Sequence, residues 1–119
     1  VGSINASSAF SIYAGNHFAD WLGSHLAAGT DFNKDGFDDL LIGAMQGHTD
    51  GGAVGCVQLV LGVSSAPFPS IARWCGTRDL QFASILATRA PDINHDGIPD
   101  IVIGSVTPAM VSVFFGLGL

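Results

Sequence analysis

The chain has 119 residues, of which 48% are apolar, so it is long enough for one domain with a packed core and its composition argues against disorder. All ten acidic residues are Asp, against one Lys and three Arg, and the net charge is −6. No run of Lys or Arg is present to displace counterions from phosphates, which argues against a nucleic-acid partner. Asp favours turns and metal loops over helices, so the composition indicates strands and loops.

Apolar runs bounded by Gly, Asp and Pro predict eight short strands and very little helix. In chain order these strands cover residues 8–14, 24–30, 39–45, 53–61, 70–75, 84–89, 100–105 and 110–116. Together they predict two four-stranded antiparallel units. Residues 101–119 carry no charge, but Gly104, Pro108 and many β-branched residues argue against a transmembrane helix.

The chain contains an internal repeat, which is the strongest organising signal in the sequence. Residues 31–44 recur as residues 92–105, displaced by 61 positions, and each copy then runs through an apolar strand to a Gly, at Gly62 and Gly116. Repeats of this length are typical of propellers and solenoids. We therefore expect a single domain, 1–119, of two β-propeller-type blades at about 16–76 and 77–119, with 1–15 an outer strand that completes a neighbouring blade.

Each repeat carries the pattern DxNxDGxxD, which supplies the hard oxygen ligands that Ca²⁺ prefers. A Gly at the sixth position allows the sharp turn. We expect two Ca²⁺ sites. The candidate ligands are the side chains of Asp31, Asn33, Asp35 and Asp39 with the carbonyl of Phe37, and the side chains of Asp92, Asn94, Asp96 and Asp100 with the carbonyl of Ile98.

The alternative is two acidic turns without metal, since Asp, Asn and Gly are ordinary turn residues. Two loops in register favour the metal, because carboxylates clustered without a cation repel one another. An EF-hand is excluded, because its bidentate Glu would fall at Ile42 or Ile103. His95 stands at a non-ligand position of the second loop, where we expect it to face solvent.

Two further modifications are candidates. Cys56 and Cys75 fall in neighbouring predicted strands and could form a disulfide in an oxidising compartment, the alternative being two buried free thiols. Asn5 begins an Asn-Ala-Ser sequon, which makes it a glycosylation candidate in a eukaryotic secretory route or a chance occurrence.

No catalytic constellation is recognisable in the sequence. It has no GxSxG elbow, HExxH pair or phosphate-binding Gly loop, so we expect no enzyme activity. Trp21, Trp74 and Tyr13 could form a sugar-stacking surface or serve only in packing between blades.

These residues resemble the FG-GAP repeats of integrin α-subunit propellers and related secreted proteins. The segments that carry the resemblance are 22–27, 31–43 and 51–54 in the first repeat, and 82–87 and 92–104 in the second. The resemblance implies calcium-binding propeller blades in a secreted or cell-surface structural or adhesion module. The alternatives it implies are a carbohydrate-binding propeller module and a non-catalytic domain of a secreted hydrolase.

Two blades bury their faces only against each other, which leaves two apolar faces open. We therefore expect the chain to be part of a larger propeller or to self-associate into a ring or filament. Its expected partners are copies of itself or neighbouring blades, with an extracellular protein or glycan as a further possibility.

Overall fold

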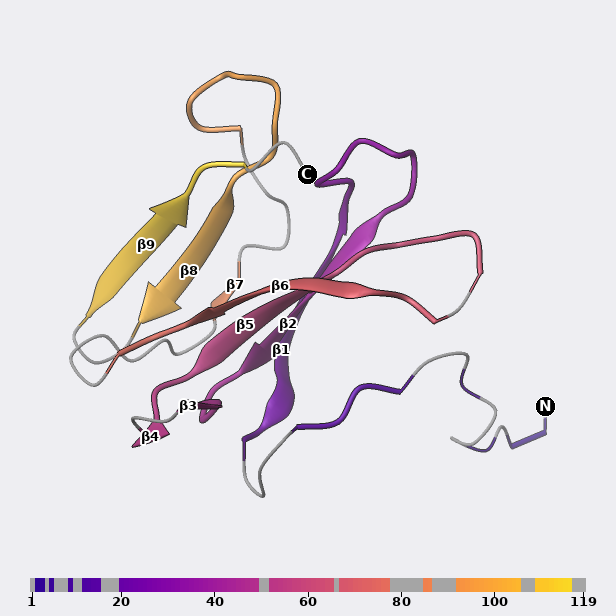
Figure 1. The fold of residues 1–119 in the computed structure, drawn as a ribbon, viewed down its shortest axis with the longest axis horizontal. Coiled ribbons are helices and arrows are strands. Elements are labelled where there is room, and N and C mark those ends of the chain that lie inside the picture. The colour runs from indigo at the N-terminus through magenta and orange to yellow at the C-terminus, as the bar shows by residue number, and fades with distance from the viewer. Residues whose placement is uncertain are drawn as a thin grey trace.

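The computed structural model describes residues 2, 3, 5, 9, 12–15, 20–49, 52–65, 67–77, 85–86, 92–105 and 109–116, and within them all regular structure is β-strand. The strands are β1 (Leu22–Thr30), β2 (Asp39–Ala44), β3 (His48–Thr49), β4 (Gly52–Ala53), β5 (Cys56–Val60), β6 (Ser70–Cys75), β7 (Ile85–Leu86), β8 (Ile101–Ser105) and β9 (Met110–Phe114). The all-β, antiparallel fold predicted from the sequence is confirmed (Figure 1).

The first repeat forms a four-stranded sheet in the order β1-β2-β5-β6, and all of its pairs are antiparallel. The short β3–β4 hairpin lies in the connection between β2 and β5. The second repeat forms a three-stranded sheet, β7-β8-β9, within the described part of the chain, where the sequence predicted a four-stranded unit. Meandering sheets of this kind are the units from which propellers are built.

The two sheets share one core, which lies between them. Leu41, Val57 and Leu59 on the first sheet are buried together with Ile101 and Ile103 on the second. Val57 and Leu59 alternate along β5, and Ile101 and Ile103 along β8, as the period of two in a strand requires. At the outer end of this interface Trp74 of β6 lies against Phe114 of β9, with 6.2 Å between ring centroids. The two repeats therefore stack as adjacent blades.

Two predicted strands differ from the structure. The strand expected over 53–61 is split into β4 and β5, because the amides of Val54 and Gly55 both donate to the carbonyl of Gly47 and turn the chain. The strand expected over 8–14 is absent at its described residues 9 and 12–14, and its remaining residues lie outside the described part. For the strand expected over 84–89, the structure describes Ile85 and Leu86, which form β7.

Cys56 and Cys75 form a disulfide, as predicted. They are directly opposite residues of β5 and β6, so the bridge fastens β6, an edge strand in the described sheet, to the centre. The two cysteines are 19 residues apart in sequence, and closing a loop of that size removes entropy from the unfolded chain.

Replacing Cys56 and Cys75 together by Ala should lower the free energy of unfolding by about 3 kcal/mol. Urea denaturation monitored by tryptophan fluorescence measures the loss. Reduction of the native chain with dithiothreitol is the matched control and should give a similar decrease. An unchanged urea midpoint in both cases would show that the bridge does not contribute to stability.

Candidate metal loops

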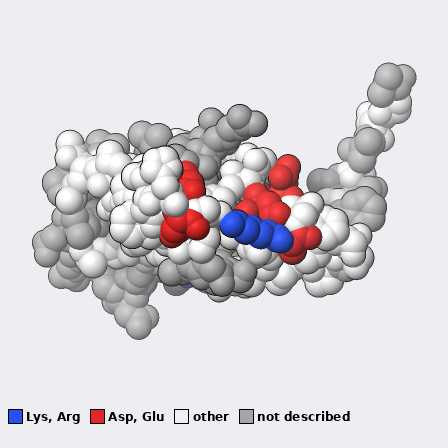
Figure 2. Space-filling view, turned by 90° about the horizontal axis from the view of Figure 1, so that it is seen from above, with Lys and Arg blue, Asp and Glu red and all other residues white. Residues whose placement is uncertain are grey.

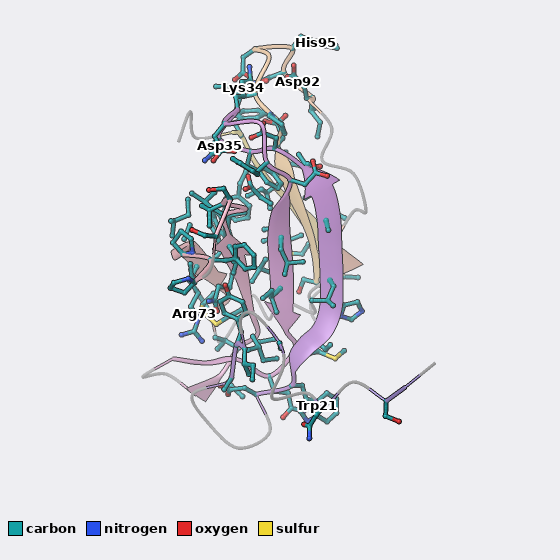
Figure 3. All side chains as sticks on the ribbon, turned by 90° about the vertical axis from the view of Figure 1, so that its right-hand side faces the viewer. Trp21, Lys34, Asp35, Arg73, Asp92 and His95 are labelled. Atoms are coloured by element: carbon teal, nitrogen blue, oxygen red, sulfur yellow. A yellow bond between two sulfur atoms is a disulfide. The ribbon has the colours of Figure 1, made fainter. Side chains whose placement is uncertain are left out.

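The two aspartate-rich loops lie at the same end of the molecule, between β1 and β2 and directly before β8. Figure 3 shows Lys34, Asp35, Asp92 and His95 gathered there, at the end opposite Trp21, and Figure 2 shows acidic side chains in two groups on one face. The loops are close neighbours, because a Cβ built on Gly97 would lie 3.5 Å from the Lys34 ammonium nitrogen. This contact comes from the stacking of the two blades.

The first loop is held by its own polar side chains. Asp31 accepts hydrogen bonds from the amides of Asp35 (3.1 Å) and Gly36 (2.8 Å), and Asp35 accepts one from the amide of Phe37 (2.9 Å). The side chain of Asn33 accepts from the amide of Asp35 (3.2 Å) and donates to its carboxylate (2.9 Å). The predicted ligand side chains therefore gather around one turn.

The second loop repeats this pattern bond for bond. Asp92 accepts from the amides of Asp96 (3.1 Å) and Gly97 (2.8 Å), and Asp96 accepts from the amide of Ile98 (2.7 Å). Asn94 again accepts from the amide of Asp96 (3.2 Å) and donates to its carboxylate (2.8 Å). The backbone also matches, since the residues after the Asn, Lys34 and His95, have left-handed φ values of 60° and 59°.

The last Asp of each loop has a different environment from the others, because it is buried. Asp39 is 1% exposed and accepts from the amides of Phe32 (2.7 Å) and Gly62 (2.8 Å). Asp100 is fully buried and accepts from Ile93 (2.6 Å) and Gly116 (2.8 Å). Each of these carboxylates joins the start of its loop to a Gly two residues beyond β5 or β9.

The glycines two residues beyond β5 and β9, Gly62 and Gly116, were not predicted to belong to the site. A Cβ at Gly62 would collide with the carbonyl oxygen of Asp38, and one at Gly116 would lie 2.6 Å from the carbonyl oxygen of Pro99. The chain can bring these amides to the buried carboxylates only where no side chain intervenes. The sequence signal was the recurrence of Gly after the apolar strand that follows each loop.

The two buried aspartates differ in acidity. Burial raises the pKa of Asp39 above its ordinary value of 3.8, the amides of Gly62 and Phe32 oppose this, and the charges of Asp35 and Asp31 add to it. Burial is also the largest single effect on the pKa of Asp100. There, three amide hydrogen bonds, from Gly116, Ile93 and Asn94, together outweigh burial and lower the pKa below 3.8.

Within the described residues, no group of three or more His, Cys, Asp or Glu side chains is already arranged as a metal site. The carboxylates of both loops accept hydrogen bonds from backbone amides. Two of the five expected Ca²⁺ donors in each loop are not acidic, because they are an Asn side chain and a backbone carbonyl. Each carboxylate oxygen that accepts one hydrogen bond keeps a second lone pair for a cation. The donor set is all oxygen, as Ca²⁺ requires.

The other candidate residues occupy separate places. His95 is exposed, as predicted. Trp74 packs between the blades against Phe114, Tyr13 donates a hydrogen bond to the carbonyl of Phe68, and Trp21 is exposed. Asn5 is described and exposed, but Ala6 and Ser7 of its sequon lie outside the described residues. No helix in the described part of the chain is long and apolar enough to cross a membrane.

The stacked meandering sheets with an aspartate loop in each repeat define a β-propeller-type repeat protein. Residues 22–55 match the family model for the FG-GAP repeat. The chain is 34% identical to human integrin alpha-6 over 105 residues, which are 87% of this chain and 9% of that protein. It is 36% identical over 98 residues to integrin alpha-7 of Rattus norvegicus and of Mus musculus, covering 79% of this chain and 8% of each.

Residues 22–55 therefore match an FG-GAP repeat, and such repeats are β-propeller blades. The chain spans less than a tenth of the length of the curated relatives it matches. The family model covers the first loop and the strands around it, and the longer alignments extend the similarity over most of the chain.

Proposed function

We propose that the chain is a calcium-stabilised structural or adhesion module of the extracellular space, without enzyme activity of its own. The observation that carries this proposal is that both loops gather the same set of carboxylate and amide oxygens around one turn, and this all-oxygen donor set suits Ca²⁺. The similarity to integrin alpha chains supports the adhesive and extracellular setting.

Calcium would neutralise the carboxylates that gather in each loop. Asp31, Asn33, Asp35, Asp39 and the carbonyl of Phe37 would hold one ion, and their counterparts Asp92, Asn94, Asp96, Asp100 and the carbonyl of Ile98 the other. Among these donors, Asp39 already feels the charges of Asp31 and Asp35, and a bound cation would relieve that repulsion. Because Asp39 is the first residue of β2 and Asp100 directly precedes β8, cation binding would stiffen both blades.

The stabilisation expected from calcium is moderate. With a dissociation constant of about 0.1 mM and about 1 mM free Ca²⁺, each site adds about 1.4 kcal/mol to the free energy of unfolding. Calorimetric titration should show uptake of two ions, and the thermal midpoint should fall when a chelator is added.

Asp35→Asn and Asp96→Asn should each abolish one of the two binding events. Asp38→Asn is the matched control, because Asp38 is exposed in the same loop but is not an expected ligand. The proposal fails if calorimetry detects no uptake, or if the melting temperature is the same in millimolar calcium and in chelator.

We further infer self-association from the exposed apolar side chains of β9, since a surface of this kind marks an interface. This part of the proposal does not depend on calcium and is tested separately below.

A further inference from the structure

The second blade exposes a surface that the first blade buries. The repeats place Val111 and Val113 of β9 at the positions of Val57 and Leu59 of β5, 54 residues earlier. Val57 and Leu59 are fully buried, whereas Val111 is 65% and Val113 45% exposed. In the described structure β9 also pairs on one side only, with β8. Within the described part of the chain, both the face and the edge of β9 are therefore open to a further strand and sheet.

The segment 12–15 has the sequence position of the strand that would fill this edge. A displacement of 61 residues aligns it with residues 73–76, the end of β6 and the Gly that follows it. In this alignment Tyr13 corresponds to Trp74. Since β6 pairs with β5, and β9 is the counterpart of β5, segment 12–15 is the counterpart of the strand that β9 lacks in the described structure.

The position of Tyr13 supports this correspondence. Trp74 packs on Phe114 of the next blade, and the counterpart of Phe114 in the first blade is Val60. Tyr13 and Val60 line the same cavity of about 320 Å³, and the Tyr13 hydroxyl is fixed by its hydrogen bond to the carbonyl of Phe68. Tyr13 therefore lies on the first blade as Trp74 lies on the second.

The next two residues of the segment continue across the same face. Ala14 and Gly15 line a second cavity, of about 240 Å³, together with Cys56 and Gln58 of β5. Segment 12–15 thus follows the path of a preceding blade's outer strand, yet it forms no strand, and Ile12 is 72% exposed. A strand forms when its backbone N–H and C=O groups pair with those of a neighbouring strand. Segment 12–15 lies against the first blade but is paired with no strand in the described structure.

We propose that segment 12–15 of one copy adds to β9 of a second copy as the fourth strand of its second blade. In this contact the copy that supplies segment 12–15 is the donor and the copy that supplies β9 is the acceptor. The first blade of the donor packs on Val111 and Val113 of the acceptor, as the second blade packs on Val57 and Leu59 within one chain. This inference rests on the self-association named above and is independent of calcium. The contact is heterologous, so repetition gives a ring or a filament.

The internal ladder fixes the register of this contact. In β5 and β6, Cys56 is opposite Cys75, Val57 opposite Trp74 and Gln58 opposite Arg73. Applying the two displacements places Met110 opposite Ala14, Val111 opposite Tyr13 and Ser112 opposite Ile12. The position of the native disulfide therefore recurs between copies at Met110 and Ala14.

A cross-linking experiment tests both the partner and the register. Chains carrying Ala14→Cys are mixed with chains carrying Met110→Cys under mild oxidation, and the products are mapped by mass spectrometry. We expect a disulfide-linked heterodimer to be the main product. The control mixture pairs Ala14→Cys with Val111→Cys, which is one residue out of register on the opposite face, and should yield at least tenfold less. Tyr13→Ala in the donor should lower the yield of the in-register pair severalfold.

Absence of the in-register cross-link, or equal yields from the two mixtures, would overturn the inference. The experiment is run in calcium and in chelator alongside calorimetry on the same samples. Calcium uptake without the cross-link would reject only the strand exchange. The cross-link without calcium uptake would reject only the calcium function.

Discussion

Replacing Leu59 by Ala should lower the free energy of unfolding by about 3 kcal/mol, because Leu59 is fully buried in the core between the two sheets. The truncation removes apolar contact area and leaves a cavity between β5 and the second blade. Since this interface holds the two blades together, the loss should also make the second sheet more susceptible to proteolysis. Urea denaturation followed by tryptophan fluorescence measures the change.

Val113→Ala is the matched control, since Val113 is the repeat counterpart of Leu59 and is 45% exposed. At protein concentrations low enough to keep the chain monomeric, this variant should lose less than about 1 kcal/mol. Equal losses for the two variants would contradict the assignment of the core to the space between the sheets.

Replacing Asp39 by Ala should cost about 3 kcal/mol even in the presence of a chelator. Two amides, those of Phe32 and Gly62, would lose their acceptor in a buried place, and each orphaned donor costs about 1–3 kcal/mol. The chelator ensures that the loss does not arise from a missing metal ligand. Asp38→Ala is the control: Asp38 directly precedes Asp39 and its carboxylate is exposed, so this change should alter the free energy of unfolding by less than about 0.5 kcal/mol.

The pH dependence should distinguish Asp39 from Asp100. The lowered pKa of Asp100 means that its ionisation stabilises the fold above pH 3.8 and that this contribution disappears as the pH falls through the lowered value. The raised pKa of Asp39 has the opposite sign: its contribution is complete below pH 3.8 and is lost as the pH rises through the raised value.

In chelator, the destabilisation caused by Asp100→Asn should therefore shrink between pH 7 and acid, whereas that caused by Asp39→Asn should grow. Denaturant unfolding of both variants at several pH values provides the comparison. Parallel pH profiles for the two variants would mean that the surroundings of the two carboxylates do not differ as the structure indicates.

Local features of the fold and of the candidate site could be predicted from the sequence. Apolar runs bounded by Gly, Asp and Pro placed β1, β2, β6, β8 and β9 close to their observed bounds. The repeat of DxNxDGxxD located the two loops, and their shared hydrogen bonds follow from residues at most five positions apart. The Cys56–Cys75 bridge was foreseen because both residues lie in neighbouring strands.

Features that join distant residues could not be predicted in this way. The pairing of Asp39 with the amide of Gly62 spans 23 residues, and it depends on how β5 ends beside the loop. The split of the expected strand 53–61 depends on the carbonyl of Gly47. The approach of Lys34 to Gly97 arises only when one blade stacks on the other.

The sequence by itself determined the repeat, the strands and the chemistry of the two loops, because each depends on neighbours along the chain. The tertiary structure decided which faces are buried: equivalent residues such as Leu59 and Val113 have the same apolar character, yet only the first is covered by another sheet. Burial depends on what packs against a residue, and that information lies in the arrangement of the blades.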